Sequence, residues 1–171
     1  MNLNDILLKR CSVRSYTQAP VSKDTIAEIL YAGMAAPVSH KLYKDIQFTV
    51  IQDEVALKKI NSYFANQPSP FYHAPALIIL STKTNTPENI YAFNLACIVE
   101  NMLLKATELN LGSIFLTKFL EDLKDNPDFR KEFSIQKESV PIAAVAIGTP
   151  VNSLCNNNWN EIVKRILVNW Y

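Results

Sequence analysis

Glycine, histidine and cysteine are all scarce in this chain. Only Gly33, Gly112 and Gly148 occur among 171 residues, so neither G-x-G-x-x-G nor G-x-x-x-x-G-K-S/T can be written anywhere, which excludes nucleotide binding through a glycine-rich loop. The two histidines and three cysteines show neither C-x-x-C nor H-E-x-x-H spacing. We therefore expect no metal site.

The chain also lacks an excess of positive or negative charge, because 17 basic residues balance 16 acidic ones and the formal net charge is +1. Such a balance creates no overall field that would attract nucleic acid or anionic lipid. No apolar run approaches the length of a membrane span, and the N-terminus lacks the pattern of a cleavable signal. The odd cysteine count argues against a secreted, disulfide-bonded scaffold. We expect a cytoplasmic protein that binds neither nucleic acid nor membrane.

What the chain does contain is typical of one globular domain, with 49% hydrophobic and 19% charged residues. We expect residues 1–171 to form a single domain, with residues from about 152 onward as a C-terminal tail or arm. Hydrophobic periodicity predicts helices and strands. The helices are residues 3–9, 22–34, 53–64, 86–112, 119–123 and 127–133, and the strands are residues 46–51, 76–80, 113–116 and 142–147.

The longest predicted helix has Thr86 as its N-cap, Pro87 in its first position and Gly112 near its end. Its middle, residues 91–104, is apolar on nearly every side, which predicts a helix buried all round. It would run roughly 35 Å, more than a domain of this size easily covers alone. We therefore expect a partner subunit to cover part of it. The aromatic tail, residues 160–170, is expected to form a helix or an arm on a neighbour.

Residues suited to binding a phosphate group follow the first helix. Arg10, Ser12 and Arg14 place two forked guanidinium donors and a hydroxyl on one side of an extended stretch. The alternative is a solvated basic loop, and composition alone favours that alternative.

Other candidate catalytic residues are few. Cys11 lies between Arg10 and Arg14, which makes it a candidate nucleophile, although the favoured interpretation is that it fills a tolerant structural position. No G-x-S-x-G elbow is present, and His40 and His73 lie in polar loops, so a catalytic triad is not expected.

Seven short segments occur in the order typical of the FMN-dependent nitroreductase family, which the chain resembles over most of its length. They are residues 10–16, 20–30, 32–39, 70–75, 96–102, 109–113 and 140–150. The resemblance implies an α+β fold, with a nitroreductase-like central mixed sheet flanked by helices. It also implies a long buried helix at a homodimer interface and one FMN at each of two subunit interfaces.

The resemblance further implies an oxidoreductase that transfers hydride from NADH or NADPH, through flavin N5, to nitroaromatics, quinones or similar small acceptors. No side chain is expected to be catalytic, because the flavin carries the chemistry. The resemblance assigns these residues to flavin binding: Arg10, Cys11, Ser12, Arg14, Pro37, Val38, Ser39, Lys41, Asn66, Thr117 and Lys118.

The assigned residues have separate roles in the family pattern. Residues 10–14 match the phosphate and ribityl contacts, and residues 37–39 match a loop that the partner subunit lays against the flavin. Thr117 and Lys118 fall where a backbone N–H reaches flavin N5. Asn66 or Gln67 falls where a side chain reads the pyrimidine edge.

The chain also departs from the family pattern. An asparagine and Gln-Pro-Trp usually follow the Ala-Pro-Ser stretch, but residues 40–46 read His-Lys-Leu-Tyr-Lys-Asp-Ile. Lys41 in place of the asparagine is a hypothesis, as is Lys164 or Arg165 in place of the usual C-terminal basic residues. Two other functions stay open: a non-catalytic flavin-binding module for storage or sensing, and an interaction protein without a ligand.

Overall fold

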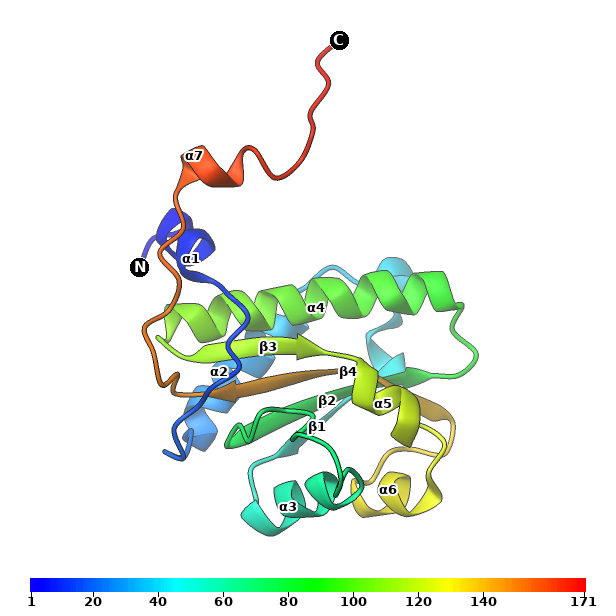
Figure 1. Cartoon of the computed structure of the whole chain (residues 1–171). Coiled ribbons are helices and arrows are strands. Elements are labelled where there is room, and N and C mark those ends of the chain that lie inside the picture. The colour runs from blue at the N-terminus through cyan, green and yellow to red at the C-terminus, as the bar shows by residue number, and fades with distance from the viewer.

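A four-stranded sheet forms the centre of the computed structural model, which describes residues 1–171 (Figure 1). Its strands are β1 (Ile46–Ile51), β2 (Ala76–Lys83), β3 (Gly112–Leu116) and β4 (Ser139–Gly148). They lie in the order β1-β2-β4-β3, and every neighbouring pair is antiparallel. This corrects our expectation of a mixed sheet, because the parallel contact is an isolated bridge between Ser12 and Ser113.

Helices cover both faces of this sheet (Figure 1). They are α1 (Leu3–Lys9), α2 (Lys23–Met34), the 3-10 helix η1 (Ser39–Asp45), α3 (Glu54–Ser62), α4 (Glu88–Glu108), α5 (Lys118–Leu123), α6 (Pro127–Glu132) and α7 (Trp159–Ile162). Two apolar cores result, one with α2 and α4 and the other with α3, α5 and α6. Residues of β2 alternate between them, which explains why its apolar run is continuous.

The ends of α4 differ from those predicted. Pro87 is the N-cap and makes no side-chain cap bond, while the Thr86 hydroxyl is buried without a partner. At the other end Asn110 adopts a left-handed conformation (φ 57°), and its N–H and that of Leu111 donate to helix carbonyls at 3.0 and 2.8 Å. These paired bonds form a Schellman motif, so Asn110 ends the helix. Gly112 instead begins β3.

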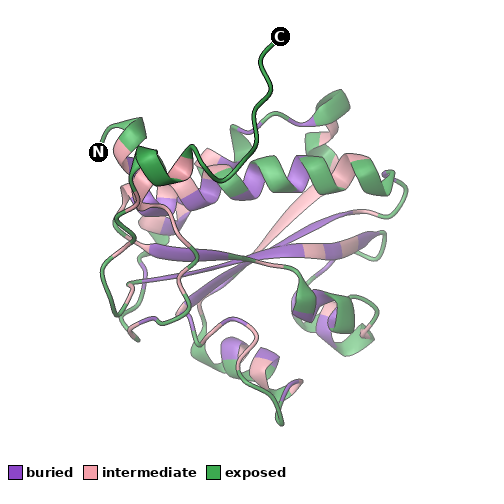
Figure 2. Cartoon of the chain, turned by 45° about the horizontal axis from the view of Figure 1, so that its top comes forward, coloured by how far each residue is buried: buried purple, intermediate pink, exposed green.

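The exposure of α4 also differs from the prediction. Leu95, Val99 and Met102 are buried against the sheet and α2, but Phe93 is 71% exposed and Cys97 is exposed as well. Figure 2 shows buried and exposed residues alternating along the helix. One side of α4 is therefore open in a single chain, and the prediction of burial on every side is wrong for the single subunit.

The C-terminal segment returns along the N-terminal one. Thr17 N–H donates to Thr149 O at 2.9 Å, Val151 N–H to Ser15 O at 3.1 Å, and Asn157 N–H to Leu8 O at 3.2 Å. Beyond α7, residues 163–171 form an exposed arm that extends away from the body (Figure 1). No helix of the chain combines the length and the apolar character that crossing a membrane requires.

Gly148 supports a close contact that we expect to be sensitive to substitution. An added Cβ would lie 2.6 Å from Pro75 Cδ and 3.0 Å from Tyr16 Cδ1, and the proline ring cannot rotate away. Gly148→Ala should therefore lower the free energy of unfolding by about 1–3 kcal/mol, measured by urea denaturation. Gly33→Ala is the control, because its Cβ would meet the flexible end of Met102. Equal losses in both variants would contradict this explanation.

Candidate functional site

The stretch from Arg10 to Tyr16 is fixed against β3. Val13 N–H donates to Ser113 O at 3.0 Å, and Tyr16 Oη donates to Val13 O at 2.8 Å. Burial raises the pKa of the Tyr16 phenol well above its usual value, so the phenol stays neutral and keeps its donor. Ser12 and Arg14 are exposed. These two hydrogen bonds therefore fix the backbone around Ser12 and Arg14, while the side chains of both residues are exposed to solvent.

The two arginines differ in how their charge is used. Arg10 Nε lies 3.6 Å from Glu100 Oε1 of α4, a partner that the sequence did not reveal. Arg14 makes only a 3.5 Å bond from Nη1 to the Ser12 carbonyl. Because a guanidinium carries five N–H donors, most of those of Arg14 are available to an anion. Arg14 is therefore better placed than Arg10 to bind an anion, while Glu100 orients and partly neutralises Arg10.

A cavity of about 450 Å³ lies beside Arg14. It is lined by Arg14, Ser15, Tyr16, Gln18, Pro68, Ser69, Tyr72 and His73. Neither Asn66 nor Gln67 contributes to this lining, although both precede it directly in the chain. Tyr72 and His73 are both left-handed, with φ 56° and 54°, and Ser69 Oγ accepts a bond from His73 N–H at 3.1 Å. Strain of this kind is commonly kept where a loop has a functional shape.

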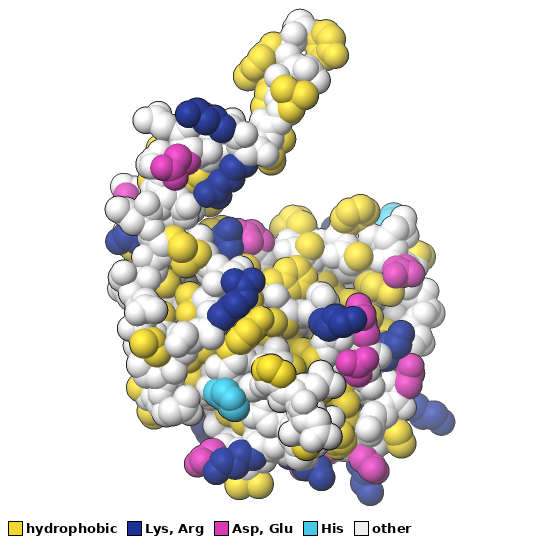
Figure 3. All heavy atoms as spheres, in the orientation of Figure 1, with side chains coloured by type: hydrophobic (Ala, Val, Ile, Leu, Met, Phe, Trp, Pro, Cys, Tyr) yellow, Lys and Arg dark blue, Asp and Glu magenta, His cyan; other side chains and the backbone are white.

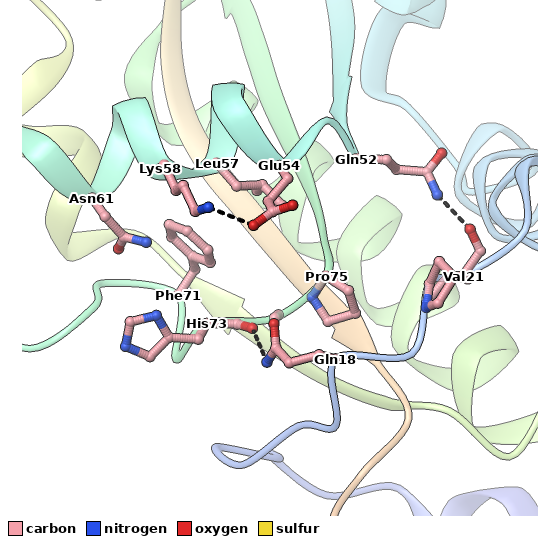
Figure 4. Close-up of a pocket in the computed structure, with 12 residues that line it drawn as sticks. Gln18, Val21, Gln52, Glu54, Leu57, Lys58, Asn61, Phe71, His73 and Pro75 are labelled. Atoms are coloured by element: carbon pink, nitrogen blue, oxygen red, sulfur yellow. Dashed lines mark hydrogen bonds and ion pairs between the residues drawn. The ribbon is translucent and has the colours of Figure 1, made fainter.

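A neighbouring cavity of about 510 Å³ shares Gln18 and His73 with the first one (Figure 4). Several of its polar side chains already have partners: Gln18 Nε2 donates to His73 O at 3.3 Å, Gln52 Nε2 donates to Val21 O at 2.6 Å, and Lys58 pairs with Glu54, whereas Oδ1 of Asn61 has no partner. Phe71 forms part of its wall. This cavity offers no cation comparable to Arg14, so it is the poorer phosphate site.

Residues 37–41 are held by the first half of α4. Ser39 N–H donates to Oδ1 of the buried Asn94 at 2.9 Å, and Val38 packs into the core with α2 and α4. Pro37, Ser39 and Lys41 are exposed, and Lys41 is left-handed (φ 56°). No hydrogen bond or ion pair joins this loop to residues 10–14 within one chain.

Thr117 follows the end of β3. Its N–H donates no hydrogen bond within the chain, while its carbonyl accepts from Leu120 at 3.0 Å. The Lys118 side chain is exposed, with Nζ 3.8 Å from Glu121. Ser113 and Thr117 are separated by about 13 Å at roughly 3.3 Å per strand residue. Strand β3 thus links residues 10–14 at one end to a free backbone donor at the other.

Of the two C-terminal basic residues, Lys164 and Arg165, only Arg165 is linked by hydrogen bonds to the segment that precedes residues 10–14. Arg165 Nη2 donates to Asn157 Oδ1 at 2.9 Å, and Asn157 Nδ2 in turn donates to Leu8 O at 2.9 Å. The Lys164 side chain forms no ion pair or hydrogen bond. Of the two candidates, the structure therefore favours Arg165 as the added cation.

Comparison with known proteins supports both the fold and the family resemblance of the sequence. The nitroreductase family pattern matches residues 7–72 and 65–149. A protein of Archaeoglobus fulgidus, provisionally named NADH dehydrogenase/NAD(P)H nitroreductase, is 26% identical over 147 residues, which are 85% of this chain and 83% of that protein.

Solved structures give the same result. A nitroreductase from Bacteroides fragilis with bound FMN has a TM-score of 0.82 at 23% identity, over 99% of this chain and 100% of that one. A provisionally named NADH oxidase from Clostridium acetobutylicum has a TM-score of 0.77 at 25% identity, over 98% and 100%. By its sequence pattern and its fold, this chain belongs to the nitroreductase family.

Proposed function

We propose that the protein is an FMN-dependent oxidoreductase that carries hydride from NADH or NADPH to a small acceptor such as a nitroaromatic or a quinone. The observation that carries this proposal is the stretch of residues 10–14, which is fixed against β3 and presents an exposed Ser12 together with the available Arg14, which lines a cavity. The A. fulgidus and B. fragilis proteins, with NAD(P)H nitroreductase and bound FMN in their descriptions, support it.

The donor set of this strand suits a phosphate monoester. Ser12 offers an exposed hydroxyl, and Arg14 offers a guanidinium whose donors are nearly all available. Arg10 adds a second guanidinium, which the Glu100 carboxylate holds in place at 3.6 Å. Charge-assisted bonds of this type are about twice as strong as neutral ones. Residues 10–14 would therefore hold the FMN phosphate, with Arg165 nearby.

FMN, when bound, supplies hydride acceptance and donation, which no amino-acid side chain offers. The chain's own part is to bind and orient. The Thr117 N–H, which has no partner within the chain, would donate to a ring nitrogen at the far end of β3. Ser69 would present a hydroxyl to the polar edge of the ring, because it lines the cavity beside Arg14. The neutral Tyr16 holds the strand and transfers no proton.

We propose a homodimer in which each copy completes the site of the other. The open side of α4 around Phe93 and the exposed Pro37 and Ser39 lie on neighbouring parts of one surface, since Asn94 holds Ser39. Uncovered apolar area of this kind usually marks an interface. Residues 37–39 make no hydrogen bond or ion pair with residues 10–14 of their own chain, so a second copy is the partner that would use them.

The arm of residues 163–171 supports the same assembly. Most of its side chains are apolar or aromatic and exposed, namely Val163, Ile166, Leu167, Val168, Trp170 and Tyr171, and it stands clear of its own subunit (Figure 3). The outer edge of β1 pairs with no strand, and an apolar cavity of about 450 Å³ lies beside it, lined in part by Met34, Tyr43 and Val50. An exposed apolar segment and an open strand edge beside an apolar cavity are complementary. The arm of one copy would pack at β1 of the other.

Reduction by nicotinamide is the test of the proposed function. The purified protein should be yellow, and NADH or NADPH added without oxygen should bleach its absorbance. Because one cleft would serve the nicotinamide and then the acceptor, double-reciprocal plots at several NAD(P)H concentrations should be parallel. Intersecting lines would reject the shared cleft. Bound FMN that neither nicotinamide bleaches would indicate a binding module, and a colourless protein that FMN does not bind would indicate an interaction protein.

A further inference from the structure

Two cysteines from opposite ends of the chain meet within and beside residues 10–14, the stretch proposed above to bind phosphate. The N–H of Cys155 donates to Cys11 Sγ at 3.2 Å, although the two residues are 144 positions apart. Backbone bonds on both sides hold the segments together, from Val151 N–H to Ser15 O at 3.1 Å and from Asn157 N–H to Leu8 O at 3.2 Å. The contact between the cysteines is thus part of a fixed pairing of two chain segments.

Both thiols are free, and a reagent can reach them. Cys155 is exposed and Cys11 is partly exposed. Cys155 also lines a cavity of about 540 Å³, together with Lys9, Asn110 and residues 149–156. A cavity of this size admits a small polar oxidant, and its lining carries no carboxylate that would repel an anion.

The charges around the pair are positive. Arg10 and Arg165 both act on Cys155 and favour its thiolate. The hydrogen bond with Cys11 and partial burial act in the opposite direction and are larger, so the pKa of the Cys155 thiol is raised. The geometry that keeps the two residues side by side before any reaction is the backbone bond from Cys155 N–H to Cys11 Sγ at 3.2 Å.

We propose that Cys11 and Cys155 are a modification site, at which hydrogen peroxide forms a reversible disulfide. The sulfur of one thiolate attacks a peroxide oxygen, the O–O bond breaks, and hydroxide leaves to give a sulfenic acid. The second sulfur then attacks the first and displaces the hydroxyl group, which leaves as water after taking a proton. Two thiols and one peroxide thus give one disulfide and two waters, with one electron lost from each sulfur.

The proposed disulfide would join two segments that both carry candidate phosphate-binding arginines. Cys11 lies between Arg10 and Ser12, and Cys155 lies in the segment that leads to Arg165. The disulfide would tie the C-terminal segment to the phosphate-binding strand and close a very long loop. Such a cross-link should raise the melting temperature by roughly 5–15 °C. The proposal rests on the contact between the two cysteines and needs no bound FMN.

Peptide mapping of the intact protein is the decisive experiment. The reduced chain is treated with one equivalent of hydrogen peroxide, digested without reductant and analysed by mass spectrometry. We expect a linked pair of peptides with Cys11 and Cys155, a mass lower by two hydrogens, and full reversal by dithiothreitol. Cys97→Ser should keep this linkage, whereas Cys155→Ser should abolish it and leave Cys11 reactive toward dimedone as a sulfenic acid.

Two outcomes would overturn the proposal. One is oxidation of Cys11 and Cys155 separately to sulfinic acids without a linked peptide. The other is cross-linking through Cys97 between two copies alone. Because the linked mass is read from the peptides and does not depend on bound flavin, failure of this proposal is distinguishable from failure of the proposed oxidoreductase activity.

Discussion

Replacing Arg14 with alanine should lower the affinity for FMN by about tenfold to a hundredfold, because one charge-assisted contact contributes roughly 1.5–3 kcal/mol. The fold should survive, since the Arg14 side chain is exposed and its only internal bond is the 3.5 Å contact with the Ser12 carbonyl. Titration of apoprotein with FMN, followed by quenching of flavin fluorescence, measures the loss directly. Circular dichroism of the same samples shows whether the fold is intact.

Three further variants make this prediction specific. Arg14→Lys keeps the charge but removes the forked donors, so its affinity should fall between wild type and alanine. Glu100→Gln removes the charge that neutralises Arg10 but keeps a side-chain oxygen that can accept from its guanidinium, so FMN affinity should be equal or higher. Lys131→Ala removes an exposed cation of α6, away from residues 10–14, and should change nothing. Equal affinity in wild type and Arg14→Ala would remove Arg14 from the site.

The sequence predicted most strongly those elements whose signals are local. The apolar run of residues 76–80 indicated a strand buried on both faces, and β2 is one. Ser22 caps α2 as predicted, because its side chain accepts from Thr25 N–H at 3.1 Å. Cap residues and alternation act within a few positions of the chain, so they can be read without the fold.

The predictions from sequence were wrong or incomplete where tertiary contacts determine the helix ends and the partners of side chains. Thr86 and Gly112 have residue types suited to helix ends, but Pro87 and Asn110 take those positions. Asn94 and Glu100 hold Ser39 and Arg10 across the fold, and no pattern in the chain links such distant positions. The left-handed Tyr72 and His73 shape the cavity beside Arg14, yet neither residue type signals that conformation. Local signals therefore predicted individual helices and strands, whereas residues 10–14 were singled out by the family resemblance and their partners required the structure.

The open side of α4 identifies the position that tests the dimer. Val99, in the middle of the helix, is fully buried in its own subunit, so an aspartate there would unfold the chain whether or not it dimerises. Phe93 is 71% exposed and can be changed without disturbing either core. Because a two-fold interface contains each residue twice, Phe93→Asp should weaken dimerisation by about a thousandfold, at roughly 2 kcal/mol per copy.

Sedimentation at micromolar concentration should then show a folded Phe93→Asp monomer that has also lost most of its FMN, because residues 37–39 would no longer be supplied by a second copy. The matched control is Val55→Asp, which places the same charge on α3 at a residue that is 75% exposed and should leave a flavin-loaded dimer. A Phe93→Asp dimer of unchanged stability would place the interface elsewhere. A monomer that binds FMN as tightly as wild type would show that one subunit suffices for the site, and residues 37–39 would then serve only the fold.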